Sequence, residues 1–214
     1  MHKIDLFIFD LDGTLADTRL DLTNSVNYAR ERLGLPALDV EAVIKYVGNG
    51  VRRLMERSLP EEKQDKIDEA ISHFRSHYKD HALVYTKLYP GVKEVLSHFQ
   101  SKKMAVISNK PEEFSRNILR GLEVDTYFEL ILGGDSLPVM KPNPEPILKL
   151  LAALNTMPDK TVIVGDGTTD IEAGKHAKIL TCAVTYGFKK KEILLPAQPD
   201  FMVDDILELK RLFG

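Results

Sequence analysis

The sequence predicts a doubly wound α/β fold with a mostly parallel sheet and a small all-helical domain inserted after the first strand. Two observations lead to this fold class. Short apolar runs alternate with helical patterns over most of the 214 residues, as in chains that cover a parallel sheet with helices. Between residues 18 and 84 this alternation stops, and only helical patterns remain.

Five runs have the character of buried strands. Each is nearly continuous in apolar residues, whereas a strand with one solvated face would alternate apolar and polar residues. The predicted strands are residues 4–9 (IDLFIF), 103–108 (KMAVIS), 128–134 (FELILGG), 160–165 (KTVIVG) and 179–187 (ILTCAVTYG). Runs of this kind are typical of the central strands of a parallel sheet.

The segments between these strands carry the helical period. Residues 91–100 and 145–155 place apolar side chains three or four positions apart, which gives each predicted helix one apolar face. Residues 168–178 begin with Thr and Asp, which cap helix N-termini. A strand, a helix and a further strand make a βαβ unit, so the predicted strands run parallel.

The inserted segment contains two apolar stripes. Leu22, Val26, Ala29 and Leu33 share one face of a first helix, and residues 67–78 carry a second stripe in a highly charged helix. We expect its hinges near residues 16–18 and 87–91, where Pro90 and Gly91 restart the α/β pattern. The predicted domains are an α/β catalytic core of residues 1–16 and 87–214 and a helical cap of residues 17–86.

Composition and charge narrow the classes of partner. With 43% hydrophobic and 29% charged residues, the chain has the composition of a soluble globular protein, and its formal net charge is −3. Nucleic-acid-binding proteins usually carry a basic patch, so we expect no nucleic-acid partner. The short basic run Lys189–Lys191 is followed by Glu192, and we interpret it as the solvated start of a helix.

The N-terminus and the single cysteine indicate the compartment. His2, Lys3 and Asp5 interrupt the first positions, which is unlike a signal peptide. No apolar stretch approaches the roughly 18 residues needed to cross a bilayer. Cys182 is the only cysteine, and its apolar surroundings in the sequence predict a small buried residue. We therefore expect a cytoplasmic protein with no membrane partner.

Polar side chains follow the predicted strands at the points where those strands end. Open parallel sheets bind ligands outside the carboxyl ends of their strands, so we expect these groups to converge. They are Asp10 and Asp12 after the first strand, Ser108 and Asn109 after the second, Lys141 in the loop MKPNPEP, and Asp166 and Asp170 after the fourth.

The stretch DLDGT combines two carboxylates with a turn. If the strand continues, Asp10 and Asp12 share a face, so both side chains meet one substrate. Gly13 permits a sharp turn, which we expect Thr14 to hold through a local hydrogen bond. Alone, such a stretch also fits a turn or part of a calcium-binding loop, although the helical flanks and later ligands of that loop are missing.

Several carboxylates around one point repel one another unless a cation lies among them. Oxygen ligands without histidine favour a hard ion such as Mg²⁺, which binds one or two carboxylates together with phosphate oxygens. One carboxylate can act as a nucleophile and a second as general acid and base. The sequence therefore predicts a magnesium-dependent site for a small phosphorylated metabolite.

Four motifs resemble those of the haloacid dehalogenase superfamily of phosphatases. They are DLDGT, ISNK, the lysine of MKPNPEP and VGDGTTD, which occur in the superfamily's order and cover the whole α/β part of the chain. The resemblance implies a Rossmann-like core and an aspartyl-phosphate intermediate. It implies Asp10 as nucleophile, Asp12 as general acid and base, and Lys141 as the cation that neutralises charge on the nucleophile and the phosphate.

The same resemblance implies the binding groups. Mg²⁺ would be held by Asp10, the backbone carbonyl of Asp12 and Asp166. Asp170 would contact the metal through a bound water or support the site from behind. Ser108, with Asn109 beside it, would bind the phosphoryl oxygens.

The helical insertion lies where this superfamily carries a cap that shields the site and selects the substrate. Residues 46–54 (YVGNGVRRL), with LGLP upstream and VTYGF downstream, resemble phosphoglycolate phosphatases. This resemblance implies a two-carbon acid phosphate as substrate, with Asn49 and Arg52 or Arg53 as candidates to bind its carboxylate. In the alternative interpretation, the two glycines of this stretch separate two cap helices and both arginines are solvated.

Other functions use the same acids. Pyrophosphate or a sugar phosphate could be the substrate, and a sugar-phosphate mutase could use the same aspartyl-phosphate. A non-catalytic phospho-acceptor resembling a receiver domain shares the acidic strand ends, but such domains lack a large helical insertion. A pure phospho-acceptor also has no use for Asp12 as acid and base. The sequence is compatible with a monomer or a homodimer.

Overall fold

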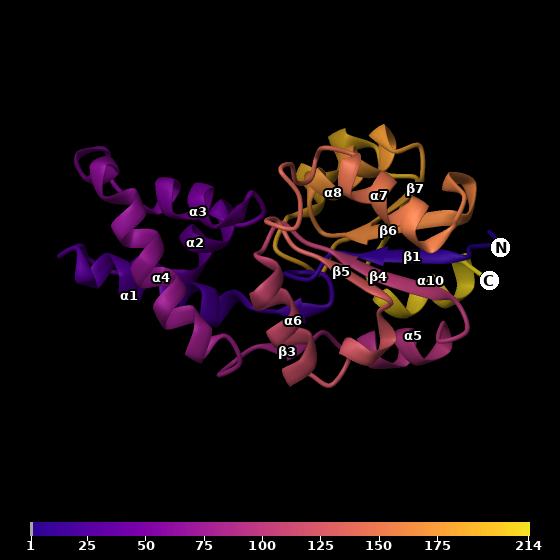
Figure 1. The fold of residues 1–214 in the computed structure, drawn as a ribbon, viewed down its shortest axis with the longest axis horizontal. Helices are drawn as coiled ribbons and strands as arrows, with labels where there is room; N and C mark the ends of the chain where they lie inside the picture. Colours follow the sequence, from indigo (N-terminus) through magenta and orange to yellow (C-terminus); the bar gives the residue numbers. More distant parts are fainter. Residues whose placement is uncertain (1) are drawn as a thin grey trace.

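A six-stranded parallel sheet forms the centre of the larger lobe in the computed structural model, which describes residues 2–214 (Figure 1). The strand order is β5-β4-β1-β6-β7-β8, and each neighbouring pair is parallel. The strands are β1 (Leu6–Phe9), β4 (Lys103–Ile107), β5 (Leu130–Leu132), β6 (Thr161–Gly165), β7 (Leu180–Val184) and β8 (Phe201–Val203). The predicted fold class is confirmed.

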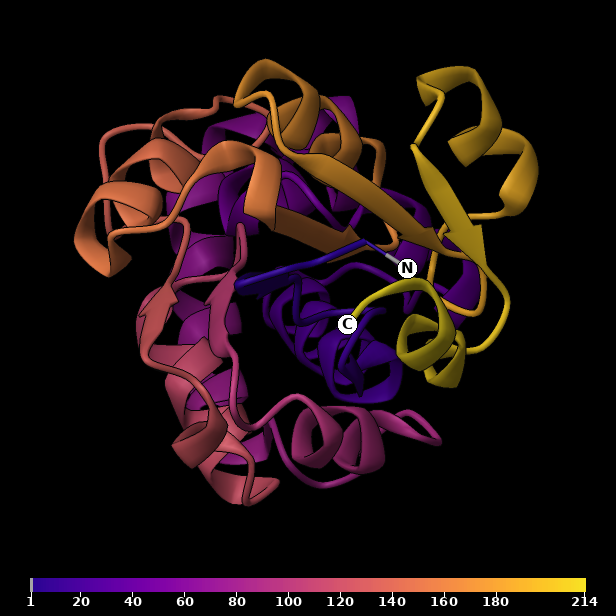
Figure 2. The ribbon, with the colours of Figure 1, turned by 90° about the vertical axis from the view of Figure 1, so that its right-hand side faces the viewer.

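Helices cover both faces of this sheet, while a separate group forms the smaller lobe (Figures 1 and 2). Around the sheet lie α5 (Val92–His98), α6 (Glu112–Gly121), α7 (Glu145–Leu154), α8 (Thr168–His176), α9 (Lys191–Leu194) and α10 (Leu209–Leu212). The smaller lobe, which we call the cap, contains α1 (Arg19–Arg32), α2 (Val40–Tyr46), α3 (Gly50–Ser58) and α4 (Ile67–His81). We call the larger lobe the core.

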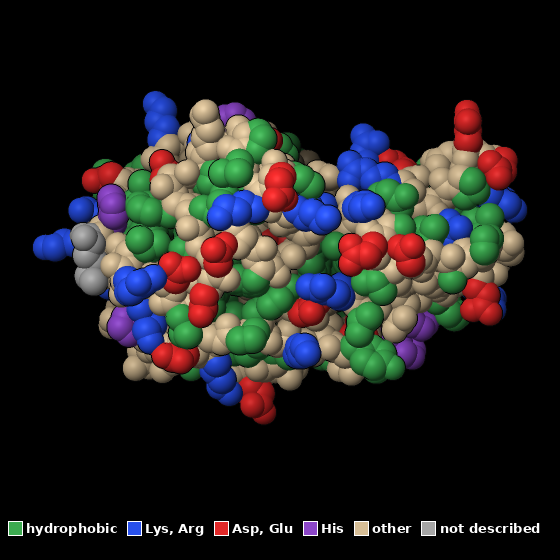
Figure 3. All heavy atoms as spheres, turned by 180° about the vertical axis from the view of Figure 1, so that it is seen from behind, with side chains coloured by type: hydrophobic (Ala, Val, Ile, Leu, Met, Phe, Trp, Pro, Cys, Tyr) green, Lys and Arg blue, Asp and Glu red, His purple; other side chains and the backbone are tan. Residues whose placement is uncertain are grey.

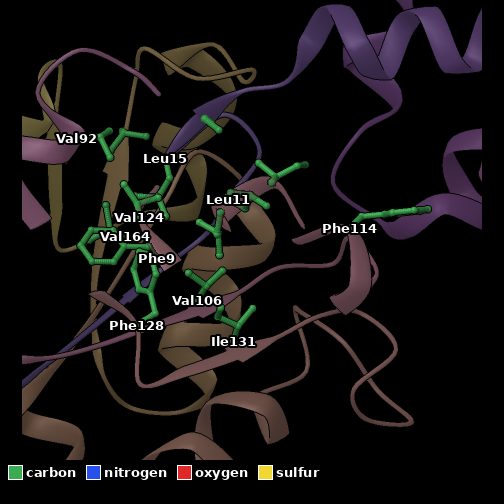
Figure 4. Close-up of a cluster of buried hydrophobic side chains, with 14 of the residues drawn as sticks. Phe9, Leu11, Leu15, Val92, Val106, Phe114, Val124, Phe128, Ile131 and Val164 are labelled. Atoms are coloured by element: carbon green, nitrogen blue, oxygen red, sulfur yellow. The ribbon is translucent and has the colours of Figure 1, made fainter. Parts of the chain in front are cut away.

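The apolar strands supply two faces to the hydrophobic interior. Phe7 and Phe9 of β1 pack in the cluster covered by α5, α6 and α10, part of which Figure 4 shows. Leu6 and Ile8 point to the other face and pack against α7 and α8. All four side chains are fully buried, which explains why the sequence of this strand is continuously apolar rather than alternating.

A short two-stranded ribbon joins the cap to the core. In it, β2 (Ala16–Asp17) pairs antiparallel with β3 (Lys87–Leu88). The buried carboxylate of Asp21, in the first turn of α1, accepts hydrogen bonds from the backbone N–H groups of Tyr85 and Thr86. The two connections between the lobes are therefore bonded to each other and to the first cap helix. The boundaries expected from the sequence, 16/17 and 86/87, lie at the two strands of this ribbon.

The five predicted strands are all present, although each is shorter than its apolar run. Strand β8 was not predicted: it has three residues and pairs only with β7, from Cys182 opposite Phe201 to Val184 opposite Val203. Cys182 is buried as expected. Helix α6 was also not predicted, because its apolar residues Phe114, Ile118 and Leu119 are spread over a mostly polar segment.

The two chain ends lie together at the end of the sheet farthest from the cap (Figure 1). Positive and negative side chains are mixed on the face shown in Figure 3, over both lobes. None of the helices between residues 2 and 214 combines the length and the apolar character needed to cross a bilayer.

Candidate active site

One pocket lies where the carboxyl ends of the strands face the cap. The core lines it with the carboxylates and lysines described below, and the cap closes it with backbone and apolar side chains. Its lining residues include Asp10, Asp12, Ser108, Asn109, Lys110, Lys141, Asp166 and Lys189 from the core, and Leu22, Val47, Gly48, Asn49, Gly50, Val51, Leu54, Phe74 and Tyr78 from the cap.

The loop after β1 holds Asp10 and brings the backbone close to Asp166. The N–H of Asp10 donates to the carbonyl of Val164 in β6 (2.9 Å), which continues the parallel pairing past the strand end. Gly13 has φ +81°, and a Cβ there would lie 2.2 Å from the Asp166 carboxylate. A side chain at this position would therefore displace Asp166. Thr14 makes a local hydrogen bond through its backbone N–H, which donates to the carbonyl of Leu11 (3.2 Å), while its buried hydroxyl has no partner among residues 2–214.

Lys141 is the buried cation at the centre of the site. Its side chain is 1% exposed, and its Nζ lies 3.1 Å from Asp10 Oδ1 and 2.5 Å from Asp170 Oδ1. It also donates to the carbonyl of Ile107 at the end of β4. Burial opposes its charge, yet Asp10 and Asp170 raise the pKa of Lys141 above its ordinary value. The lysine therefore stays protonated between two carboxylates.

Three carboxylates lie close together in the site. Oxygen atoms of Asp10, Asp166 and Asp170 all lie within 4.8 Å of one another. Burial, with the other two carboxylates, raises the pKa of Asp166 to about 8. Burial raises the pKa of Asp10 to about 6, against the opposing effect of Lys141. Lys141 alone therefore does not balance this charge, and an all-oxygen set of this size fits a hard divalent cation such as Mg²⁺.

Removing divalent cations is expected to destabilise the protein, by more at pH 8.5 than at pH 6. The raised pKa values mean that the folded state without a cation binds more protons than the unfolded state, so its stability falls as pH rises from about 4 to about 8. A cation that binds only the folded state adds about 2.7 kcal/mol at 100 times its Kd. Melting temperatures in EDTA and in MgCl₂ at both pH values measure this difference.

The matched variant for this test is Asp166→Asn, which is expected to remove the Mg²⁺-dependent stabilisation and to raise the melting temperature in EDTA at pH 8.5. An Mg²⁺ increment that is the same at both pH values would contradict the charge balance described above.

Asp12 is held apart from these three carboxylates by its own partners. Lys110 Nζ donates to both of its oxygens at 2.8 Å, and the Thr18 hydroxyl donates to Oδ1 at 2.6 Å. Lys110 also lies 4.8 Å from the ring centroid of Tyr78 in α4. Burial disfavours its charge, yet Asp12 raises the pKa of Lys110. Sequence reasoning gave no role to Lys110, although it stands directly after Ser108-Asn109.

The loop after β4 presents Ser108 and Asn109. Ser108 is 3% exposed and lines the pocket beside Asp10. The Asn109 side-chain NH₂ donates to the carbonyl of Lys141 (2.8 Å) and to the carbonyl of Gly48 in the cap (2.9 Å). Asn109 therefore joins the core to the cap, which the prediction of phosphate binding did not anticipate.

The cap contributes Asn49 to the pocket but not Arg52 or Arg53. The side chain of Arg52 is 58% exposed and pairs with Asp68, and that of Arg53 is 67% exposed and pairs with Glu56. Neither arginine lines the pocket. The first buried residues of α3 are Leu54 and Met55, so its first turn leaves positions 52 and 53 on the solvent side. The placement agrees with the alternative interpretation of solvated arginines.

Two other cations were not anticipated at the cap side of the site. Arg57, one helical turn after Arg53, donates to Asn49 Oδ1 (2.8 Å) and to the carbonyl of Tyr46 (3.1 Å). Lys189, which was interpreted as solvated, lines the pocket and donates to the Lys45 carbonyl of the cap. The interpretation of this run as the solvated start of a helix holds for Lys190 and Lys191, which are exposed where α9 begins, but it is wrong for Lys189, which precedes the helix.

Comparisons with known proteins indicate the family of this chain. A family model described as haloacid dehalogenase-like hydrolase matches residues 7–184. A phosphoglycolate phosphatase of Aquifex aeolicus is 41% identical over 97% of this chain and 95% of its own length. One from Nitrosococcus oceani is 34% identical over 100% of this chain and 98% of its own length.

A solved structure gives the same answer for the fold. The crystal structure of a predicted phosphoglycolate phosphatase from Haemophilus somnus has a TM-score of 0.91 and 31% identity, and the match covers 98% of this chain and 97% of that one. The family model spans the four motifs that surround the pocket. The chain therefore belongs to the haloacid dehalogenase-like hydrolases and is a phosphatase of that family.

Proposed function

We propose that the protein hydrolyses 2-phosphoglycolate to glycolate and phosphate, with Mg²⁺ as cofactor and an aspartyl-phosphate on Asp10 as intermediate. The observation that carries the chemistry is the pairing of Asp10 with buried Lys141 beside two further carboxylates. The observation that supports the substrate is the full-length similarity to relatives named phosphoglycolate phosphatase.

Substrate binding uses the donors at the strand ends. The phosphoryl group enters the pocket beside Asp10, where the Ser108 hydroxyl and the Lys141 ammonium group are available to its oxygens. Mg²⁺ would be held by Asp10, the backbone carbonyl of Asp12 and Asp166, with Asp170 behind them. The ion would supply positive charge to the phosphoryl oxygens. Lys141 keeps Asp10 ionised and oriented for attack.

In the first half-reaction, an oxygen of Asp10 attacks phosphorus and the bond between phosphorus and the glycolate oxygen breaks. Asp12, which lines the same pocket, donates a proton to that departing oxygen. In the second half-reaction, Asp12 takes a proton from water, and the water oxygen attacks phosphorus. The bond from phosphorus to Asp10 then breaks and phosphate leaves, so both aspartates return to their starting states.

The cap excludes bulk water while this happens. Leu54, Phe74 and Tyr78 form apolar walls over the pocket. Electrostatic interactions with the phosphoryl group are stronger in such surroundings than in water. The segment from Val47 to Val51 lines the pocket on the cap side.

The experiment is phosphate release from a panel of substrates, compared as kcat/KM, with MgCl₂ and with EDTA. The panel holds 2-phosphoglycolate, pyrophosphate, glucose 1-phosphate and p-nitrophenyl phosphate. We expect 2-phosphoglycolate to lead by about 10-fold or more, because a site built for its carboxylate rejects analogues that lack it. EDTA is expected to abolish all four activities.

Other outcomes would replace this proposal. A higher kcat/KM for pyrophosphate or glucose 1-phosphate would change the substrate and keep the chemistry. Conversion of a sugar phosphate to its isomer without phosphate release would indicate a mutase. Stable labelling of Asp10 by acetyl phosphate, with no turnover of any ester, would indicate a phospho-acceptor.

A further inference from the structure

The pocket contains three lysines, and two of them are already neutralised. Lys110 is paired with Asp12, and Lys141 is paired with Asp10 and Asp170. Lys189 also lines the pocket, and it makes no ion pair with any residue between 2 and 214. Among the described lining residues it is therefore the one cation whose charge is left for an anionic ligand.

The position of Lys189 is fixed by contacts on both sides. On the core side, the N–H of the preceding Phe188 donates to Asp166 Oδ2 at 2.6 Å, which ties this loop to the carboxylate cluster. On the cap side, Lys189 Nζ donates to the carbonyls of Lys45 (3.1 Å) and Ile44 (3.4 Å) at the end of α2. An ammonium group has three donors, so one remains after these two bonds.

Asn49 offers a second donor in the same pocket. Its Oδ1 is occupied by Arg57, so its NH₂ group is the part left for a ligand in the pocket that Asn49 lines. Lys189 and Arg57 both bind carbonyls of the last turn of α2, from Ile44 to Tyr46, and Asn49 follows three residues later. The same pocket is therefore lined by a charged donor and an amide donor, and both connect to the end of α2.

The other cap side chains that line the pocket are apolar apart from one hydroxyl group. They are Leu22, Val47, Val51, Leu54, Phe74 and Tyr78, and the Tyr78 hydroxyl is buried without a partner among residues 2–214. A carboxylate placed against the apolar side chains would lose its hydration without gaining a partner, which is strongly unfavourable. Burial lowers the pKa of Lys189, Arg57 acts in the same direction and Asp166 opposes them. A bound anion would supply the negative charge that this lysine lacks.

We propose that Lys189 and Asn49 form the subsite for the carboxylate of the substrate, with Arg57 as the residue that positions Asn49. This inference rests on the proposed function, because it assumes a substrate with an anionic group next to the phosphate. Both lobes then select the substrate, because Lys189 belongs to the core loop after β7 and Asn49 belongs to the cap. Arg52 and Arg53 have no part in it.

The test uses two inhibitors that differ only at the carboxylate. In 3-phosphonopropionate, a CH₂ group replaces the bridging oxygen of 2-phosphoglycolate, and propylphosphonate has a methyl group in place of the carboxylate. Their inhibition constants are measured against p-nitrophenyl phosphate, with MgCl₂ present. The quantity of interest is the ratio of the constant for propylphosphonate to that for 3-phosphonopropionate.

Lys189→Met is expected to lower this ratio about 10- to 100-fold relative to wild type, as expected for loss of a hydrogen bond to a charged group. Lys189→Gln keeps a donor for the α2 carbonyls and removes the charge, so it is expected to lower the ratio as well. Lys190→Met is the matched control: Lys190 is the exposed neighbour and does not line the pocket, so the ratio should not change. Asn49→Asp keeps an oxygen for Arg57 but repels the carboxylate, and should also lower the ratio.

The outcomes separate the two proposals. If both inhibitors weaken equally in Lys189→Met and Lys189→Gln, Lys189 only holds the cap against the core and the subsite is wrong. If wild type itself shows a ratio near one, the substrate has no carboxylate and both the proposed function and the subsite fail. A high wild-type ratio that survives both Lys189 variants overturns the subsite alone.

Discussion

Replacing Asp10 with asparagine is expected to lower kcat/KM for 2-phosphoglycolate by about 10⁴-fold or more, because the amide cannot form the phosphorylated intermediate. The side chains have nearly the same shape, and Asp10 reaches its neighbours through the backbone bond to Val164 as well as through Lys141. The variant should therefore fold. Steady-state phosphate release and circular dichroism measure the two expectations.

A control variant distinguishes the loss of the proposed nucleophile from the loss of one negative charge. Asp170→Asn changes a carboxylate that also contacts Lys141 but does not line the pocket. We expect it to lose much less activity than Asp10→Asn. Equal losses in the two variants would mean that Asp10 acts only as one of several charges, and full activity in Asp10→Asn would exclude it as nucleophile.

Replacing Lys141 with methionine is expected to affect stability and activity together. Methionine preserves much of the volume of this fully buried side chain, but Asp10 and Asp170 then lose the cation between them. Breaking a buried ion pair on one side typically costs about 3–5 kcal/mol of folding free energy. Urea denaturation in EDTA measures this loss, and kcat/KM is expected to fall because Asp10, the proposed nucleophile, is no longer neutralised or oriented by Lys141.

Adding Mg²⁺ should recover part of the stability of Lys141→Met, since a cation bound by the same carboxylates offsets their repulsion. It should not recover the activity. Lys149→Met, on the exposed side of α7, is the control and should match wild type in both measurements. A Lys141→Met protein as stable as wild type in EDTA would contradict the central role of this lysine in the charge balance.

The parts of the fold that could be predicted are those buried on both sides. Strand β1 is apolar at every position because both of its faces are covered, and such a run is visible in the sequence. Strand β8 lies at the edge of the sheet, has only three residues and is partly exposed, so its pattern does not stand out. Helix α6 was missed because its buried face has only three apolar residues, Phe114, Ile118 and Leu119, within a mostly polar segment.

The candidate site also has a part that could be predicted from the sequence and a part that could not. Strand ends are fixed by the sheet, so the convergence of Asp10, Ser108 and Asp166 follows from parallel topology alone. The direction of a cap side chain depends on how α3 rotates against its neighbours, and the sequence does not record that rotation. This is why Arg53 was a candidate while Arg57, four residues later, was not. The position of Lys189 depends on the bond between Phe188 and Asp166, which joins segments 22 residues apart.

The ribbon of β2 and β3 has a consequence for how such enzymes diversify. The inserted chain leaves the core at Asp17 and returns at Lys87, and these two residues are paired with each other. An insertion whose two ends meet in this way is a module: another segment of different length can start and finish at the same ribbon without altering the register of the six strands. The phosphoryl chemistry and the choice of substrate can thus be inherited separately, except that the proposed carboxylate subsite also uses a core residue, Lys189.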